Sequence, residues 1–112
     1  MQRDIQIGTQ MVPMRATAST ALRYKAVFHG DLLIELAKKK NDAENLPIVQ
    51  QLAFILAKSA EGANMNALTM NEYIDWLDNF ETIDLVQALP AVINLYMEST
   101  APASTAKKNN SQ

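Results

Sequence analysis

The apolar residues between positions 48 and 57 constrain the fold of this chain more than any other feature. They recur at helical spacing and wrap around most of a helix: Ile48, Val49, Leu52, Ala53, Ile55, Leu56 and Ala57. A helix that is apolar on most sides is buried on most sides, so the segment predicts a central helix, with Pro47 in its first turn. Phe54 falls among the polar residues of this helix, near Gln51 and Lys58, which makes it a candidate contact residue.

Two short helices are expected before the central one. The first takes its cap from Ser19 or Thr20 and ends at Gly30, the residue type most common just after a helix. Asp31 is the expected cap of the second. The polar stretch at 41–45 then predicts a loop.

Two amphipathic helices are expected after it. Thr69 and Glu72 form a capping-box pattern, and the helix that follows is expected to turn inward Met70, Tyr73, Ile74, Leu77 and Phe80. Trp76 lies at the edge of that face. The last helix runs roughly over 83–97 and is expected to bury Leu85, Leu89, Val92, Ile93 and Tyr96. Pro90 falls inside it and removes one backbone hydrogen bond, so we expect a kink or a restart there.

The two ends of the chain differ from its helical middle. Ile5 and Ile7 alternate with polar neighbours before a turn at 8–10, so residues 1–16 predict a short β-hairpin or an irregular arm, in which Pro13 suits an edge strand. Residues 99–112 hold no bulky apolar side chain and predict a disordered tail. The expected fold class is all-α, a compact bundle of about five short helices forming a single domain over 1–98.

Several kinds of chemistry are excluded by residue types that the chain lacks. Its 112 residues include no cysteine, which rules out thiolate metal sites and thiol catalysis, and one histidine, His29. The three glycines are far apart and form no phosphate-binding loop. We expect no catalytic residue, no cofactor and no metal, and a binding protein rather than an enzyme. The absence of a signal peptide or a long apolar run predicts a cytoplasmic protein with no membrane partner.

The net charge of −2 conceals an asymmetry along the chain. Residues 1–50 carry seven Lys/Arg and five Asp/Glu, whereas residues 51–98 carry one lysine and seven acids. Because affinity for nucleic acid depends mainly on Lys and Arg, the acidic half disfavours a nucleic-acid partner. The lysines at 38–40 lack interleaved aromatic residues and are more typical of a solvated surface.

An acid recurs at every third residue across the fourth helix and beyond it: Glu72, Asp75, Asp78, Glu81 and Asp84. A calcium loop would have oxygen ligands around a glycine turn, where this chain has Trp76 and Phe80. The helical period favours a solvated face instead. An electrostatic docking ridge for a basic partner is compatible with that interpretation.

Segments in a fixed order resemble the tail assembly chaperones of siphoviruses and related prophages. They span residues 12–97 and comprise 13–18, 22–25, Phe28, Gly30, Asp31, 52–53, 56–58, 76–80, 89–90, Ile93 and Leu95. Each piece alone has spacing that many helical proteins share, and their order and intervals carry the resemblance. His29 departs from the basic or other polar residue expected at its position.

The resemblance implies a non-enzymatic factor that binds the tape-measure protein and helps recruit tail-tube subunits during tail morphogenesis. It implies a protein of the host bacterial cytoplasm that is absent from the mature virion. Such families often make a longer product by ribosomal frameshifting. Lys107 and Lys108 are as compatible with a slippery codon pair as with an ordinary polar tail. Self-association is left open.

Five residues are the candidates for partner contact: Tyr24, Phe28, Phe54, Met70 and Trp76. They are apolar residues that the helical pattern places at the edges of polar faces, where an amphipathic helix could dock. The main alternative is a small helix-turn-helix DNA-binding regulator, which would need a basic recognition helix. A small enzyme would need convergent polar residues in a pocket.

Overall fold

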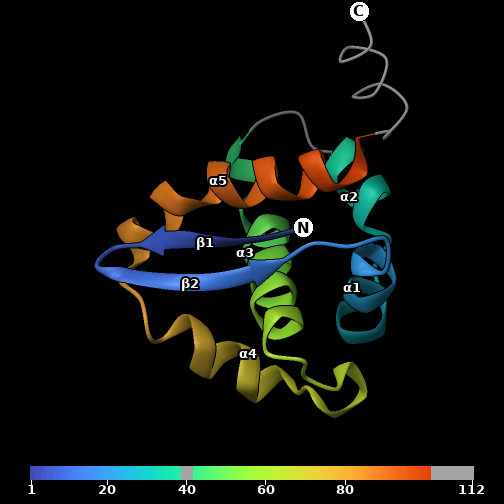
Figure 1. Ribbon diagram of the computed structural model, residues 1–112, viewed down its shortest axis with the longest axis horizontal. Coiled ribbons are helices and arrows are strands. Elements are labelled where there is room, and N and C mark those ends of the chain that lie inside the picture. Colours follow the sequence, from blue (N-terminus) through green and yellow to red (C-terminus); the bar gives the residue numbers. More distant parts are fainter. Residues whose placement is uncertain (39–41, 102–112) are drawn as a thin grey trace, which may run out of the picture.

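The protein is mostly helical, and a β-hairpin forms part of its core. The computed structural model describes residues 1–38 and 42–101. The elements are β1 (Gln2–Ile7), β2 (Gln10–Arg15), α1 (Thr20–Phe28), α2 (Leu32–Lys38), α3 (Asp42–Ala60), a 3-10 turn (Met65–Ala67), α4 (Met70–Leu77) and α5 (Thr82–Thr100). In Figure 1 the hairpin crosses the middle of the molecule, with α5 above it, α4 below it and α3 behind it. The expected mainly helical fold of five helices is confirmed over these residues, and the N-terminal β-hairpin that was one of two alternatives for residues 1–16 is present.

The N-terminal segment is an antiparallel hairpin rather than an irregular arm. Gly8 and Thr9 join the strands, and Gly8 adopts the left-handed φ of 63° that such short hairpin loops favour. Met1 and Ala16 exchange two hydrogen bonds of 2.8 Å. In an antiparallel ladder, hydrogen-bonded and non-hydrogen-bonded pairs alternate, so the Asp4–Pro13 pair is a non-hydrogen-bonded one, in which the backbone N–H groups do not take part in the ladder. The missing N–H of Pro13 therefore costs the sheet no hydrogen bond.

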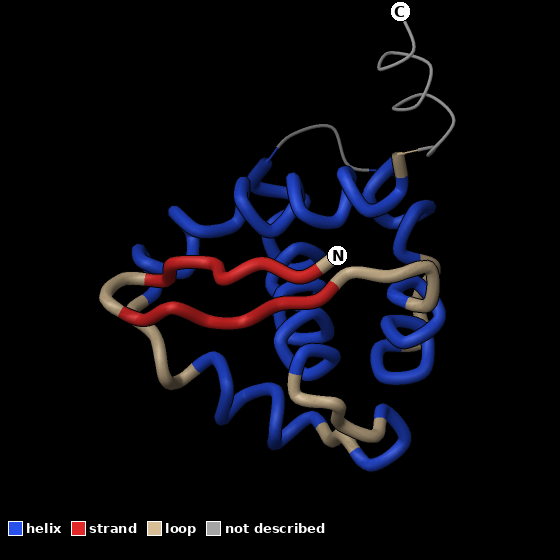
Figure 2. Tube along the Cα trace, in the orientation of Figure 1, coloured by secondary structure: helices blue, strands red, loops and turns tan. Residues whose placement is uncertain are grey.

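One face of the hairpin closes the hydrophobic core. Ile5, Ile7, Met14 and Ala16 are buried, and their neighbours along each strand are exposed or half-buried. Strand β2 packs on α3 and β1 packs on α5. Figure 2 shows the two strands flanked by helices, which explains why an isolated pair of strands is stable here. The hairpin thus belongs to the domain and is not an appended arm.

Helix α3 is the central element, as the sequence predicts. Six consecutive residues, 52–57, are almost completely buried, as expected for a helix covered on every side. The helix begins at Asp42, so the loop expected over 41–45 is wrong for 42–45, and position 41 lies outside the described residues. Pro47 lies inside the helix rather than in its first turn.

The caps of α1 and α2 are partly those expected. Ser19 occupies the N-cap position of α1 without a side-chain cap bond, while Thr20 Oγ1 accepts a hydrogen bond from Thr17 N at 2.9 Å. The left-handed residue at the end of α1 is His29, with φ 67°, and not Gly30. Asp31 Oδ1 accepts a hydrogen bond from Ile34 N at 3.3 Å, which confirms its capping role for α2.

The inward face of α4 is rotated from the expected one. Thr69 caps the helix as predicted, because its Oγ1 accepts a hydrogen bond from Glu72 N at 3.2 Å. Tyr73 and Trp76 are buried, and Met70 and Ile74 are exposed. The wide apolar pattern of this helix fits two orientations, and packing against α3 selects the one that buries the larger aromatic rings.

Helix α5 is longer than the sequence predicts. It runs to Thr100, past the end expected near 97, and residues 102–112 of the expected tail lie outside the described part of the chain. The helix continues through Pro90, so the restart that was one of the two expected effects of this proline does not occur. Four of its five expected core residues are buried, and Ile93 is half-buried. Among the described helices, none has both the length and the apolar character that crossing a membrane requires.

Candidate functional site: an apolar groove between α1 and α4

Four of the five predicted contact residues belong to one internal aromatic cluster. Ring centroids lie 5.4 Å apart for Tyr24 and Phe28, 6.2 Å for Phe28 and Phe54, and 5.7 Å for Phe54 and Trp76. Tyr73 lies 5.1 Å from Phe28 and 5.2 Å from Phe54. The cluster joins α1, α3 and α4, and its tilted and edge-to-face ring pairs add to the stability of the core.

The placement of Phe54 among polar residues is wrong. Its exposed fraction is 0%, because α1 and α4 cover the side of α3 that looks polar when the helix is considered alone. Lys58 remains on that side and places its Nζ 5.8 Å from the Phe54 ring centroid. In this conformation Phe54 is therefore a core residue.

The other candidates divide between the interior and the surface. Tyr24 and Trp76 are buried, Phe28 is half-buried, and Met70 is exposed to 58%. A partner that meets the folded domain can thus reach Met70 and part of Phe28. For Tyr24, Phe54 and Trp76 the contact role stays a prediction that their burial disfavours.

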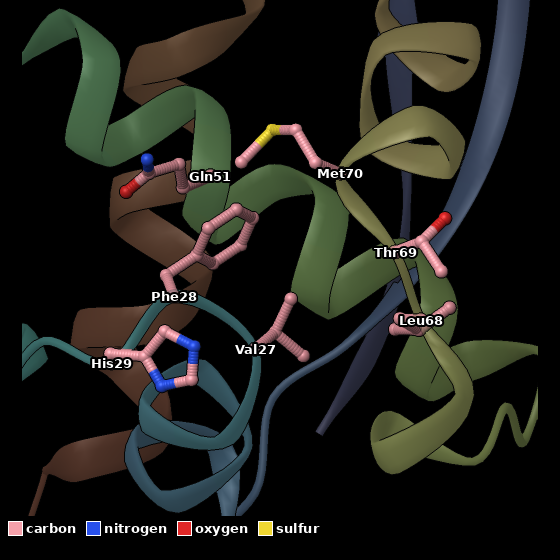
Figure 3. A pocket seen from close by; sticks show the side chains of 7 residues that line it. All are labelled: Val27, Phe28, His29, Gln51, Leu68, Thr69 and Met70. Atoms are coloured by element: carbon pink, nitrogen blue, oxygen red, sulfur yellow. The ribbon is translucent and has the colours of Figure 1, made fainter.

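Phe28 and Met70 meet at a groove between the end of α1 and the start of α4. The groove has a volume of about 380 Å³ and is lined by Val27, Phe28, His29, Gln51, Leu68, Thr69 and Met70. Figure 3 shows Met70 extending from α4 toward Gln51, with the Phe28 ring below it and Val27 facing the Leu68 side. No Lys, Arg, Asp or Glu lines this hollow, so its recognition surface is mainly apolar.

Gln51 gives the groove a polar group on α3. Its Oε1 accepts a hydrogen bond of 2.5 Å from the Tyr24 hydroxyl. Within the part of the chain that the structure describes, no residue accepts a hydrogen bond from its Nε2. The side-chain amide is thereby oriented by the core, and its N–H donors are available to a bound polar group.

Burial changes the acid–base behaviour of the tyrosines behind the groove. Desolvation raises the pKa of Tyr73 to about 12, and the nearby Tyr24 adds to the rise. Desolvation also raises the pKa of Tyr24, with a further contribution from Glu35. Both phenols are therefore neutral at physiological pH.

The acids along α4 lie on the solvent side, as the period predicts. Glu72, Asp75, Asp78 and Glu81 are exposed, and Asp84 is half-buried. Across residues 1–38 and 42–101 no three His, Asp or Glu side chains gather as metal ligands would. A second hollow of about 440 Å³, between the hairpin loop and α5, has Asp84 as its only charged lining residue.

The sequence prediction missed five groove residues: Val27, His29, Gln51, Leu68 and Thr69. The pattern gave a partial signal for Val27, which follows Tyr24 by three residues and therefore lies near it on the helix. It gave none for Leu68, which precedes the α4 cap, or for Gln51, which looked like part of a solvent-exposed face.

Comparisons of the chain with protein-family models, with curated proteins and with solved structures find no match.

Proposed function

We propose that this chain is a non-enzymatic assembly factor of the phage tail-chaperone type. In this proposal it binds an amphipathic helical segment of the tape-measure protein in the α1–α4 groove and helps recruit tail-tube subunits. The observation that carries the binding role is the groove itself, an apolar hollow of about 380 Å³ with an exposed methionine on its rim. The identity of the partner derives from the resemblance of residues 12–97 to that family.

The lining of the groove suits a helix that presents a row of apolar side chains. Val27 and Phe28 of α1 and Leu68, just before the α4 cap, offer apolar surface, and Met70 of α4 lines the same groove. The flexible thioether of methionine adapts to partners of different shape. Helices recognised in grooves insert residues spaced at i, i+3 or i+4, and i+7, which matches an elongated helical partner.

The proposal is tested by co-purification with fragments of the tape-measure protein. The variant is Met70→Glu, and the matched control is Met11→Glu, because both methionines are exposed to 58% and Met11 lies on the hairpin away from the groove. Met70 is the first residue of α4, where an acid suits the helix dipole, so the variant should fold. We expect Met70→Glu to weaken binding at least about tenfold, which corresponds to roughly 1.4 kcal/mol, and Met11→Glu to leave it unchanged.

Equal binding by the two variants would remove the groove from the proposal. The gene neighbourhood supplies an independent test, because the proposal expects a tail-tube gene on one side and a very long tape-measure gene on the other. Mass spectrometry of purified virions should not detect the protein, since a chaperone of this type acts in the host bacterial cytoplasm and leaves before the tail is complete. The nucleotide sequence tests the frameshift, which concerns residues outside those described.

A DNA-binding regulator is the weaker alternative. The acids at 72, 75 and 78 are exposed on or directly after α4, and α5 carries Asp84 and Glu98 with no Lys or Arg. A recognition helix requires the opposite charge to approach phosphates. A gel-shift assay with phage and host DNA that gave a salt-sensitive complex would favour the regulator over the chaperone.

A further inference from the structure

Helix α4 presents apolar residues on two of its sides. Tyr73 and Trp76 face the core, whereas Met70 and Ile74 remain exposed to 58% and 46%. Met70 and Ile74 are one helical turn apart and form a single row. Because Met70 also lines the groove, this row continues the groove along the outside of α4. We call the combined surface the α4 face, formed by Val27, Phe28, Leu68, Met70 and Ile74.

Unneutralised negative charge borders the α4 face. Asp75 and Asp78 are exposed, and Asp78 follows Ile74 by one helical turn. Residues 70–81 contain four acids and no Lys or Arg. The described ion pairs are Arg3–Glu98 and Lys58–Glu61, so within the described residues none of these four acids has a cationic partner.

We propose that the α4 face binds a basic amphipathic helix. The apolar row of that helix would lie over Phe28, Met70 and Ile74, and its Lys or Arg residues would pair with Asp75 and Asp78. The inference rests on the proposed function for the location of the docking site and adds the chemical class of the segment that docks. Charge complementarity of this kind fixes the orientation of a partner and rejects helices of the opposite charge.

Two synthetic helices provide the probe. Both are about 18 residues long with leucines at the same helical spacing, and they differ in having lysines or glutamates at the flanking positions. Trp76, the single tryptophan, is buried behind the face at 8% exposure and reports binding by its fluorescence. We expect the lysine peptide to bind at least about tenfold more tightly than the glutamate peptide. Its affinity should fall as salt is raised, because exposed charges are screened.

A charge reversal locates the effect on the protein. Asp75→Lys should weaken binding of the lysine peptide about tenfold and strengthen binding of the glutamate peptide. The matched control is Asp4→Lys, which makes the same change of charge at an exposed position on the hairpin. We expect the control to leave the ratio of the two affinities unchanged. Circular dichroism of both variants verifies that the helices are intact.

The possible failures are distinguishable. Equal, salt-independent binding of the two peptides would refute the basic partner while leaving the Met70 effect on the tape-measure fragments in place. Absence of tape-measure binding by the unmodified protein would refute the proposed function itself, whereas equal binding by Met70→Glu and Met11→Glu would remove only the groove from it. Dimers of the protein that form at low salt and dissociate on adding the lysine peptide would assign the face to a second copy of the chain and overturn the inference.

Discussion

At the scale of single residues, the backbone is left-handed at Gly8, His29 and Gly62 within the described chain. Gly62 ends α3 in a Schellman motif, in which Ala63 N bonds to Lys58 O at 3.0 Å and Gly62 N to Ser59 O at 3.1 Å. His29 ends α1 with its N–H bonded to Lys25 O at 2.8 Å. Glycine adopts this conformation without steric strain, whereas histidine has a Cβ that crowds the following carbonyl.

Replacement of His29 by glycine should therefore stabilise the protein. We expect the free energy of unfolding to rise by roughly 0.5–1 kcal/mol. The substitution removes the strain of the left-handed backbone, and the greater freedom of glycine in the unfolded chain offsets part of that gain. Urea denaturation measures the change. Lys25→Gly is the control inside the same helix and should lose about 1 kcal/mol. A loss of similar size in both variants would contradict the left-handed conformation at position 29.

The raised pKa of Tyr73 makes stability depend on pH in the alkaline range. The folded-state pKa is about 12 and the unperturbed value is 10.0, so the unfolded chain loses its proton first. Below pH 10 the phenol is neutral in both states and has no effect, and stability falls as pH rises from about 10 to about 12. The free energy of unfolding should fall between pH 8 and pH 11, and we expect this fall to be roughly 1 kcal/mol smaller for Tyr73→Phe than for the unmodified protein. Equal losses in urea titrations at the two pH values would show that Tyr73 ionises freely in the folded protein.

At the scale of elements, the hairpin is held against the helices at both ends. Arg3 pairs with Glu98 of α5 at 2.6 Å, and Gln10 Nε2 donates to Asn79 O at 3.2 Å. The exposed Arg3–Glu98 pair should contribute little by itself. The hairpin loop also lies close to α5, because a Cβ built on Gly8 would lie 2.6 Å from Asp84 Oδ2.

Gly8→Ala should destabilise the hairpin for two separable reasons. One is the left-handed backbone, at about 1–2 kcal/mol, and the other is contact with the Asp84 carboxylate, which rotation of that side chain can relieve. The same substitution in an Asp84→Ala background removes the contact and keeps the strain. We expect the double-mutant cycle, followed by thermal unfolding, to show a coupling of about 0.5–1 kcal/mol. Zero coupling would contradict a costly contact between position 8 and the Asp84 carboxylate.

At the scale of the whole molecule, Phe54 connects the three helices that define the groove. It contacts Phe28 of α1 and Tyr73 and Trp76 of α4. We expect Phe54→Ala to lower the free energy of unfolding by about 3–5 kcal/mol through loss of packing and creation of a cavity. Chemical denaturation followed by Trp76 fluorescence measures this loss, and Met11→Ala serves as the exposed control with a change of about 0.5 kcal/mol or less. A similarly small change at Phe54 would restore the prediction that this ring lies on the surface.

Much of the fold follows from the sequence, and less of the site does. The central helix, the hairpin turn and the Thr69 cap were all predicted, because each depends on residues within a few positions of one another. The start of α3 at Asp42 was missed, since residues 42–45 are mostly polar and carry no apolar helical period. Of the five candidate contact residues, Phe28 and Met70 line the groove. Tyr24, Phe54 and Trp76 are in the core.

The sequence by itself determined that the chain is mostly helical, where its central helix lies, and that the N-terminal segment has strand spacing. Only the tertiary structure decided which apolar residues are covered. The physical reason is that periodicity defines the faces of a helix but not its neighbours. Helices α1 and α4 cover the apparently polar side of α3 and enclose Phe54, while the same packing turns Met70 and Ile74 of α4 outward.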